Sequence, residues 1–245
     1  MSFETIIGIT QWLFLLYLGG FIGGHLMLNL LAFVYLRRYV EERCLNSLPQ
    51  FSGYEPRISI LAPAYNESAT IAASIYSLLQ LCYAEYEIIV INDGSKDRTL
   101  DMLIKEFSLV PFPESYDQRL PTKPIRTIYS SRTYSNLRVI DKHNGGKADA
   151  LNAGINLSRH PLVCCVDADS ILQCDSFQRV VQAFLDDPAT VACGGTVRVA
   201  NGCDVNGGFL TAVGLPKNIL ALFQIVEYLR AFLFGRMGWS PLNAC

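Results

Sequence analysis

The chain has 245 residues, a formal net charge of −2, and 51% hydrophobic against 17% charged residues. This length suits one large α/β domain or two small ones, and the composition is too apolar for an ordinary soluble domain. The small net charge argues against a nucleic-acid partner, because phosphate neutralisation requires a basic surface. Eight cysteines occur without a CxxC pair or a Cys/His cluster, so neither a zinc site nor a redox motif is predicted.

The first segment, residues 5–36, contains no Asp, Glu, Lys or Arg. About 20 apolar residues cross a bilayer, so this segment is predicted to be a transmembrane anchor. A signal peptide would have a basic leader and a shorter apolar core, whereas residues 1–4 carry only an acid. A buried helix of a soluble domain is the other alternative, and the length of the uncharged run disfavours it.

Arginines follow this segment directly, at Arg37, Arg38 and Arg43. Positive charge collects on the cytoplasmic side of a membrane, so the rest of the chain is predicted to be cytoplasmic. Residues 37–56 are expected to be a cytoplasmic linker.

Beyond the linker, apolar strands alternate with helical patterns, which predicts an α/β fold with a mostly parallel sheet. Ligands of such folds bind beyond the carboxyl ends of the strands. Residues 108–136 are predicted to be an irregular insertion with one strand. The expected strands are 58–62, 86–91, 125–129, 137–141, 162–166 and 191–199, and the expected helices are 66–81, 97–107 and 147–157.

Polar motifs follow the first two strands. Residues 62–67 (Ala-Pro-Ala-Tyr-Asn-Glu) could alone be a loop with a helix cap. Residues 92–95 (Asn-Asp-Gly-Ser) could form a hairpin turn, but the helical pattern that follows disfavours a hairpin. The Asp93 carboxylate, at a strand end, could accept hydrogen bonds from a ribose or a base.

A pair of carboxylates, Asp167 and Asp169, follows the apolar run 162–166. In an extended chain both side chains point the same way, so both could face one hard cation. Neighbouring acids repel one another unless a cation or a proton relieves them. The alternative is a solvated loop with a helix cap, which the apolar run disfavours.

A glycine pair precedes the predicted helix in the sequence Asn144-Gly145-Gly146-Lys147. Glycines at a helix start let backbone amides approach a phosphate, and Lys147 adds positive charge. The segment is not a Walker A loop, because Ala148 stands where Ser or Thr is required. A simple helix N-terminus is the alternative.

Taken in order, these four motifs resemble glycosyltransferase family 2, the inverting enzymes of GT-A fold that use nucleotide sugars. The resemblance covers about residues 57–200 and is nearest to the processive membrane synthases of poly-N-acetylglucosamine, chitin oligosaccharides and hyaluronan. It implies a GT-A donor-binding domain over 57–203, incomplete at its C-terminus. Residues 204–245 would be an amphipathic interfacial segment leading to a missing acceptor region. A plain core helix is the alternative for 215–235.

The resemblance also implies roles for individual residues, including a site for Mg²⁺ or Mn²⁺. By this resemblance, the uridine pocket would be lined by Pro63, Tyr65 and Glu67, and Asp93 would bind the base or ribose. Lys147 would bind the nucleotide, and Asp167 would bind the ribose or sugar. Asp169, together with Asp167, would bind the metal. The catalytic base of the family is expected C-terminal to residue 245, so little turnover is expected from this chain alone.

The implied function is a membrane-bound glycosyltransferase. It would transfer a sugar, N-acetylglucosamine by nearest resemblance, from a UDP-sugar such as UDP-N-acetylglucosamine to a growing polysaccharide. The expected partners are this donor, a glycan or lipid-linked acceptor and the membrane, with no nucleic acid. One alternative is a polyprenyl-phosphate glycosyltransferase. The other is a non-catalytic, membrane-tethered nucleotide-binding module, if residue 245 is the true end.

Overall fold

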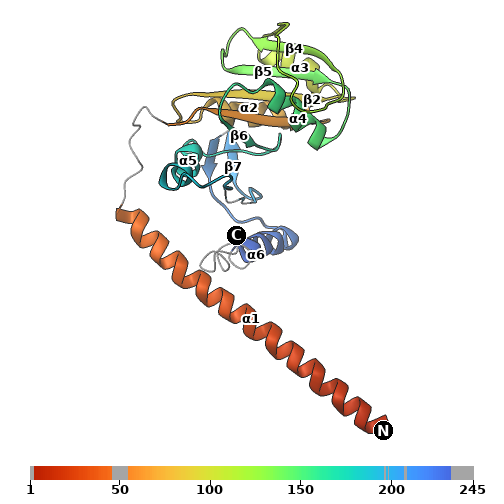
Figure 1. Ribbon diagram of the computed structural model, residues 1–245, viewed down its shortest axis with the longest axis vertical. Helices are drawn as coiled ribbons and strands as arrows, with labels where there is room; N and C mark the ends of the chain where they lie inside the picture. The colour runs from red at the N-terminus through yellow and green to blue at the C-terminus, as the bar shows by residue number, and fades with distance from the viewer. Residues whose placement is uncertain (1–2, 46–54, 196, 198, 207–208, 233–245) are drawn as a thin grey trace. The chain divides into compact units, whose positions relative to one another are not determined.

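The computed structural model describes residues 3–45, 55–195, 197, 199–206 and 209–232 (Figure 1). The chain forms two compact units. The first comprises Met1–Ser47, Thr196–Cys203 and Gly214–Cys245, and the second comprises Leu48–Gly195 and Asp204–Val213.

The second unit is built on a six-stranded mixed sheet of order β3-β4-β5-β2-β1-β6. Strand β1 pairs in parallel with β2 and β6, and β2 pairs in parallel with β5, whereas β4 runs antiparallel to both β3 and β5. The expected α/β class is therefore confirmed, with a parallel centre and an antiparallel edge. The strands are β1 (Ile58–Ala64), β2 (Tyr86–Asp93), β3 (Leu109–Pro111), β4 (Ile125–Ser131), β5 (Leu137–Lys142) and β6 (Leu162–Cys165).

Helices cover both faces of this sheet. One apolar core joins alternate residues of β1, β2 and β5 to helices α2 (Ile71–Leu79), α3 (Thr99–Glu106) and α5 (Ser176–Asp186). The other core packs the intervening residues against α4 (Lys147–Leu157). At Gly154 an added Cβ would lie 2.9 Å from Leu61 Cδ2, which is too close for a normal contact. The glycine therefore allows α4 to pack close against β1.

Three expectations for the sheet are corrected. Residues 108–136 contribute two strands, because β3 pairs with β4. The strand expected at 162–166 is shorter than expected, and it is not buried on both faces, because Val163 is 41% exposed. Among the described residues β6 pairs only with β1, and α4 packs on β1 and β2 and leaves β6 uncovered on that face. The described residues of 191–199 form no strand, and 196 and 198 lie outside them.

The rest of the second unit is a separate two-stranded sheet. It joins β7 (Asp204–Asn206) to β8 (Phe209–Ala212) in antiparallel register. The sequence motifs did not predict this pair.

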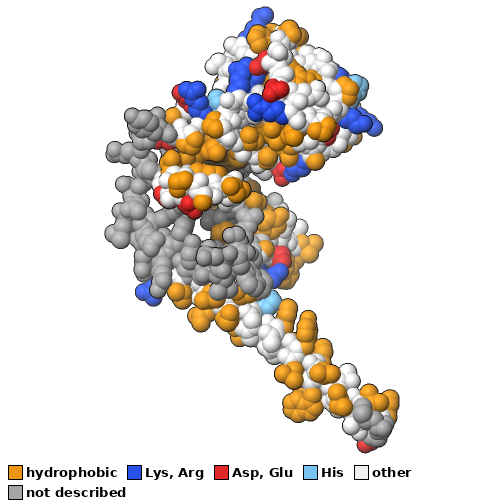
Figure 2. Space-filling model, viewed as in Figure 1, with side chains coloured by type: hydrophobic (Ala, Val, Ile, Leu, Met, Phe, Trp, Pro, Cys, Tyr) orange, Lys and Arg blue, Asp and Glu red, His pale blue; other side chains and the backbone are white. Residues whose placement is uncertain are grey.

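The first unit contains the helices α1 (Phe3–Leu45) and α6 (Ile219–Phe232). Within α1, Phe3–Val34 is long and apolar enough to cross a membrane, and its most apolar stretch is not buried by other parts of the protein. Apolar side chains are exposed along this helix (Figure 2). The helix continues to Leu45, so the first part of the expected linker is helical, and residues 46–54 lie outside the described residues.

Candidate functional site

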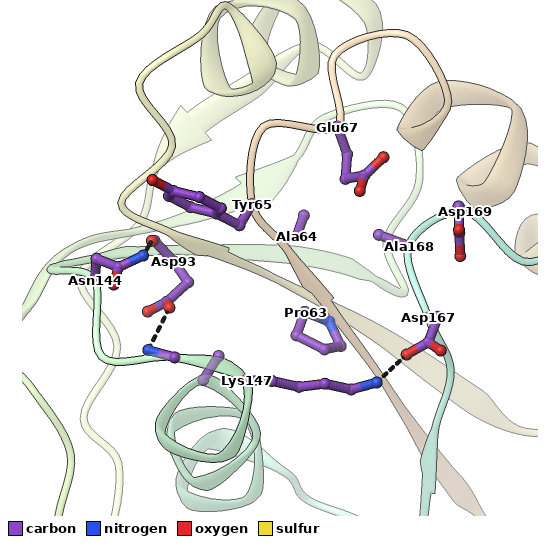
Figure 3. A pocket seen from close by; sticks show the side chains of 12 residues that line it. Pro63, Ala64, Tyr65, Glu67, Asp93, Asn144, Lys147, Asp167, Ala168 and Asp169 are labelled. Carbon is purple, nitrogen blue, oxygen red and sulfur yellow. Dashed lines mark hydrogen bonds and ion pairs between the residues drawn. The ribbon is translucent and has the colours of Figure 1, made fainter.

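A pocket of about 490 Å³ opens at the carboxyl ends of β1, β2 and β6 (Figure 3). It contains all seven side chains singled out in the sequence, which come from three strand ends and the start of α4. Its lining also includes residues that the motifs had not marked as binding groups. The pocket is lined by Pro63, Ala64, Tyr65, Glu67, Asp93, Asn144, Gly146, Lys147, Ala150, Asp167, Ala168 and Asp169.

The loops after β1 and β2 are joined to each other by reciprocal hydrogen bonds. The amide of Asn66 donates to Ser95 Oγ at 3.0 Å, and the amide of Lys96 donates to Asn66 Oδ1 at 2.8 Å. Asn66 adopts the left-handed conformation at φ 57°, which Asn tolerates better than most residues. This pairing fixes the backbone that presents Tyr65 and Glu67 to the pocket.

The Asp97 carboxylate completes this junction. It accepts hydrogen bonds from the Ser68 amide at 3.2 Å and from the amide and hydroxyl of Thr99 at 3.0 and 2.5 Å. Slight burial raises the pKa of Asp97, but these hydrogen bonds outweigh it and lower the pKa to about 2. The ionised carboxylate therefore stabilises the junction.

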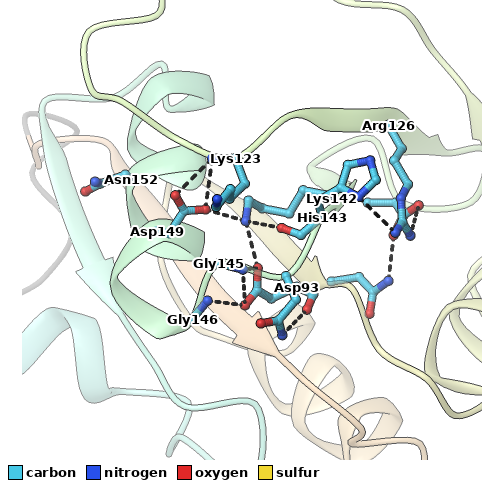
Figure 4. A network of polar contacts seen from close by, with 12 residues as sticks. Asp93, Lys123, Arg126, Lys142, His143, Gly145, Gly146, Asp149 and Asn152 are labelled. Atoms are coloured by element: carbon cyan, nitrogen blue, oxygen red, sulfur yellow. Dashed lines mark hydrogen bonds and ion pairs between the residues drawn. The ribbon is translucent and has the colours of Figure 1, made fainter.

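Asp93 is 3% exposed and lies at the back of the pocket, where it holds the glycine loop. Its Oδ2 accepts from the amide of Gly146 at 2.8 Å, and its Oδ1 accepts from the amide of Gly145 at 3.0 Å (Figure 4). Lys142 Nζ donates to the same Oδ1 at 2.7 Å. Both oxygens are thus engaged within the protein, so Asp93 positions the start of α4 whether or not it also contacts a ligand.

Lys142 is a component of the site that the motifs did not reveal. It is completely buried, and its ammonium pairs with Asp93 and Asp149 and donates to the carbonyl of His143 at 2.7 Å. Burial raises the pKa of Asp149, but the hydrogen bonds from Lys142 and the Lys123 amide and the charges of both lysines together outweigh it, so the net pKa is lowered. A polar residue at the end of the wholly buried strand β5 was the signal available in the sequence.

The loop after β2 requires a glycine where it meets the loop before α4. Gly94 has φ +68°, and a Cβ there would lie 2.7 Å from the backbone nitrogen of Asn144. The Asn144 side chain donates to the carbonyl of Asp93 at 2.8 Å, which closes the same contact. Any side chain at position 94 would separate the two loops.

Across the mouth of the pocket, Lys147 Nζ forms an ion pair with Asp167 Oδ1. The two side chains are 63% and 58% exposed, so this pair is accessible to a ligand, unlike the buried pair beneath it. Lys147 is the first residue of α4, where backbone amides and the helix dipole also favour an anion. The arrangement places positive charge beside two carboxylates.

Asp169 follows in a turn, not in the extended conformation expected from the sequence. The turn is closed by the hydrogen bond from the Ser170 amide to the Asp167 carbonyl at 3.0 Å. Among the described residues, no three His, Cys, Asp or Glu side chains cluster as a metal site. Two carboxylates still fit Mg²⁺, because this ion usually takes one or two protein carboxylates and completes its shell with substrate phosphates and water.

A sequence model of the family described as "Glycosyl transferase family 2" matches residues 59–120 and 121–224. The chain belongs to this family. The matched residues include every strand and loop that forms the pocket, and the resemblance drawn from the four motifs is thereby confirmed.

Among characterised relatives, poly-beta-1,6-N-acetyl-D-glucosamine synthase of Staphylococcus epidermidis is 31% identical over 171 residues, covering 70% of this chain and 32% of the relative. The enzyme of the same name from Staphylococcus aureus (strain COL) is 30% identical over 172 residues, with 70% and 32% covered. The chain thus spans about a third of the length of these family 2 relatives.

Solved structures show weaker similarity. The crystal structure of S. aureus TarS 1–349 has 23% identity, a TM-score of 0.39 and covers 53% of this chain and 32% of its own. A mannosyltransferase from Pyrobaculum calidifontis in complex with GDP-Man and Mn²⁺ has 20% identity, a TM-score of 0.44, and covers 66% and 45%. These TM-scores are too low for superposition to place any residue of this chain.

Proposed function

We propose that this chain carries the donor site of a membrane-bound inverting glycosyltransferase that transfers N-acetylglucosamine from UDP-N-acetylglucosamine to a growing polysaccharide. The observation that carries the proposal is the pocket of this family 2 chain, which gathers Lys147, Asp167 and Asp169 at one mouth. The choice of sugar and product rests on the named relatives, which are poly-beta-1,6-N-acetyl-D-glucosamine synthases.

Within the pocket, the proposed roles follow from position and charge. Tyr65, which is 44% exposed, and Glu67 line the side of the pocket where the uridine would lie with Pro63. Asp93 would bind the base or ribose on its pocket side while it holds the glycine loop. The bound donor would compete for the exposed Lys147–Asp167 pair, so that Lys147 contacts the diphosphate and Asp167 the ribose or sugar.

Asp169, with Asp167, would hold Mg²⁺ or Mn²⁺. Such an ion supplies positive charge that offsets the charge of the departing nucleoside diphosphate. Lys147 would also offset this negative charge, from the other side of the pocket mouth. The hydrogen bond from the Gly146 amide to Asp93 holds the start of its helix, α4, in place. The protein's own contribution is therefore orientation and charge, held by a rigid frame.

Calorimetric titration of UDP into the full chain in detergent, with and without Mn²⁺, tests this proposal. The wild type should bind UDP more tightly with Mn²⁺, and Asp169→Asn should lose most of that metal dependence. Lys147→Met should weaken binding about 10- to 100-fold, because it removes a charge-assisted hydrogen bond.

Matched controls exist on the exposed surface away from the pocket. Lys105→Met on α3 and Asp117→Asn should leave both affinity and metal dependence unchanged. Absence of UDP binding by the folded wild type would refute the donor site, and metal dependence that survives Asp169→Asn would refute the metal assignment.

The proposed membrane arrangement has α1 as the anchor, residues 37–56 as the linker, residues 57–203 as a cytoplasmic domain and 204–245 as an interfacial segment. Helix α6 supports the last part, because an exposed apolar face of Leu220, Phe223 and Val226 accompanies the Glu227–Arg230 ion pair. Alkylation of cysteines by a membrane-impermeant reagent in intact cells tests the topology. Labelling of Cys82 from outside the cell would contradict it.

A further inference from the structure

The segment that follows Asp169 is attached along α2 by hydrogen bonds. Ser74 Oγ donates to the carbonyl of Ser170 at 2.7 Å. Further on, the amide of Leu172 donates to Ser77 Oγ at 3.5 Å. Residues 170–174 therefore lead from the carboxylate turn to α5 while held against a helix of the core.

The last contact of this segment brings two cysteines together. The amide of Cys82, just after α2, donates to the carbonyl of Cys174 at 2.8 Å, and the neighbouring Cys174 side chain raises the pKa of the Cys82 thiol. With standard backbone bond lengths, this hydrogen bond keeps the two Cα atoms within about 6.7 Å of each other. A disulfide spans about 4.4–6.8 Å between Cα atoms, so this pairing matches its reach. Both cysteines are free and exposed.

The other cysteines whose side chains are described are placed differently. The thiol of Cys193 lies 3.6 Å from the carbonyl of Val180, and that of Cys203 lies 3.7 Å from the carbonyl of Gly214. Burial raises the pKa of Cys164 to about 11 and also raises the pKa of the adjacent Cys165, which lowers the thiolate fraction of both at neutral pH. Cys82 and Cys174 thus combine exposure with a backbone hydrogen bond between them.

We propose that Cys82 and Cys174 are a redox-modification site, in which oxidation joins their sulfur atoms in a disulfide that fastens the segment after Asp169 to the end of α2. The pair escapes motif searches because its members are far apart in sequence. Disulfides in reducing compartments are usually transient and redox-sensing, which fits a bond formed between two otherwise free thiols.

The oxidant is a small-molecule disulfide such as oxidised glutathione. One cysteine thiolate attacks it, forms a mixed disulfide and releases one glutathione thiolate. The second cysteine thiolate attacks the protein sulfur of that mixed disulfide and releases the second glutathione thiolate. The two cysteine protons end on the released thiolates, so two protein thiols are oxidised as one oxidised glutathione becomes two reduced molecules. The neighbouring Cys174 side chain raises the pKa of the Cys82 thiol, so the reaction should be faster at pH 9 than at pH 7.

Formation of the disulfide does not depend on the proposed donor site. Any effect of the disulfide on metal binding by Asp169 rests on the function proposed above. The reduced protein already holds the segment in the required position. We therefore expect the oxidised protein to keep its UDP affinity and to resist unfolding better, because a bond between distant residues restricts the unfolded chain.

The test incubates the full chain in detergent with oxidised glutathione, alkylates the remaining thiols and maps disulfide-linked peptides by mass spectrometry. We expect one dominant Cys82–Cys174 linkage that dithiothreitol reverses. Cys82→Ser and Cys174→Ser should each abolish it, whereas Cys203→Ser should not. The thermal midpoint of the oxidised wild type should rise by about 5–10 °C.

A dominant linkage between other cysteines, or no intramolecular linkage in the folded wild type, would overturn the proposal. Mapping on the wild type needs no variant to fold, so this result is decisive by itself. Lack of UDP binding by a protein that forms the disulfide would count against the proposed function and leave the redox site standing.

Discussion

The two ends of the parallel strands both carry buried charges, but they serve different purposes. At the amino end, Arg138 of β5 pairs with Glu87 of β2 at 2.5 Å and with Glu114 at 2.7 Å. At the carboxyl end, Lys142 of β5 pairs with Asp93 of β2 and with Asp149. The same two strands thus hold an ion pair at each end.

The two ends differ in whether a pocket opens beside the buried ion pair. At the amino end the side chains of Arg138 and Glu87 are only 5% and 7% exposed, and Arg138 also donates to the carbonyl of Leu157 at 3.0 Å. At the carboxyl end the buried pair holds the glycine loop that leads into Lys147, and Lys147 and its partner Asp167 are largely exposed at the pocket mouth. The amino end also carries an exposed charge, since Arg159 is 56% exposed and pairs with Glu114. A buried ion pair therefore indicates a rigid frame, and the pocket beside the carboxyl-end pair indicates a binding site.

Among the substitutions that test this comparison, Lys142→Met is expected to have the largest effect on stability and UDP affinity. It leaves Asp93 and Asp149 without their counter-charge and should destabilise the protein by about 3–5 kcal/mol. The glycine loop should also shift, so UDP affinity should fall about tenfold or more. Urea unfolding followed by circular dichroism, with calorimetry on the folded protein, measures both effects. Adding Asp149→Asn should recover part of the stability, and unchanged UDP affinity would show that the pair does not support the site.

Arg138→Met is the matched change at the amino end. It leaves the Glu87 carboxylate buried without its partner, so a loss of about 3–5 kcal/mol in unfolding free energy is again expected. UDP affinity of the folded protein should stay within twofold of wild type, because the hydrogen-bond partners of Arg138 in the described part of the chain, Glu87, Glu114 and the Leu157 carbonyl, all lie outside the pocket lining. An equal fall in UDP affinity from both variants would remove the distinction between the two ends.

The smallest expected effect concerns Asp97, which joins the first two loops of the site. Its pKa is lowered to about 2 in the folded protein, so its stabilising contribution is complete above the ordinary pKa of about 4 and is lost as the pH falls from there towards 2. Because the side chain is exposed, we expect less than about 1 kcal/mol. Asp97→Asn should flatten the pH dependence of urea unfolding over this range, whereas the control Asp117→Asn should retain it.

The sequence predicted those features that depend on neighbouring residues. Apolar runs placed the parallel strands within two residues, and the polar residues at their ends placed Asp93 and Asp167 in one pocket, because parallel strands end at the same edge. The hairpin alternative at Gly94 was correctly disfavoured, since β2 pairs in parallel with both of its neighbours.

Features that depend on distant pairing could not be predicted in this way. The burial of Lys142 requires Asp93 and Asp149, which come from different elements. The exposure of Val163 depends on which strands α4 covers, and the contact of Cys82 with Cys174 depends on the path taken after Asp169. The spacing of residues along the sequence does not predict which distant residues come together in these arrangements.

The half-exposed strand β6 has a practical consequence for preparing the second unit. Among the described residues its outer edge pairs with no other strand, and Val163 and Cys165 face outwards beside it. An unprotected edge with apolar side chains is a template for strand addition between molecules. A fragment cut to the sheet and its helices is therefore prone to self-association, and a lysine in place of Val163 is the substitution that should keep it monomeric at high concentration.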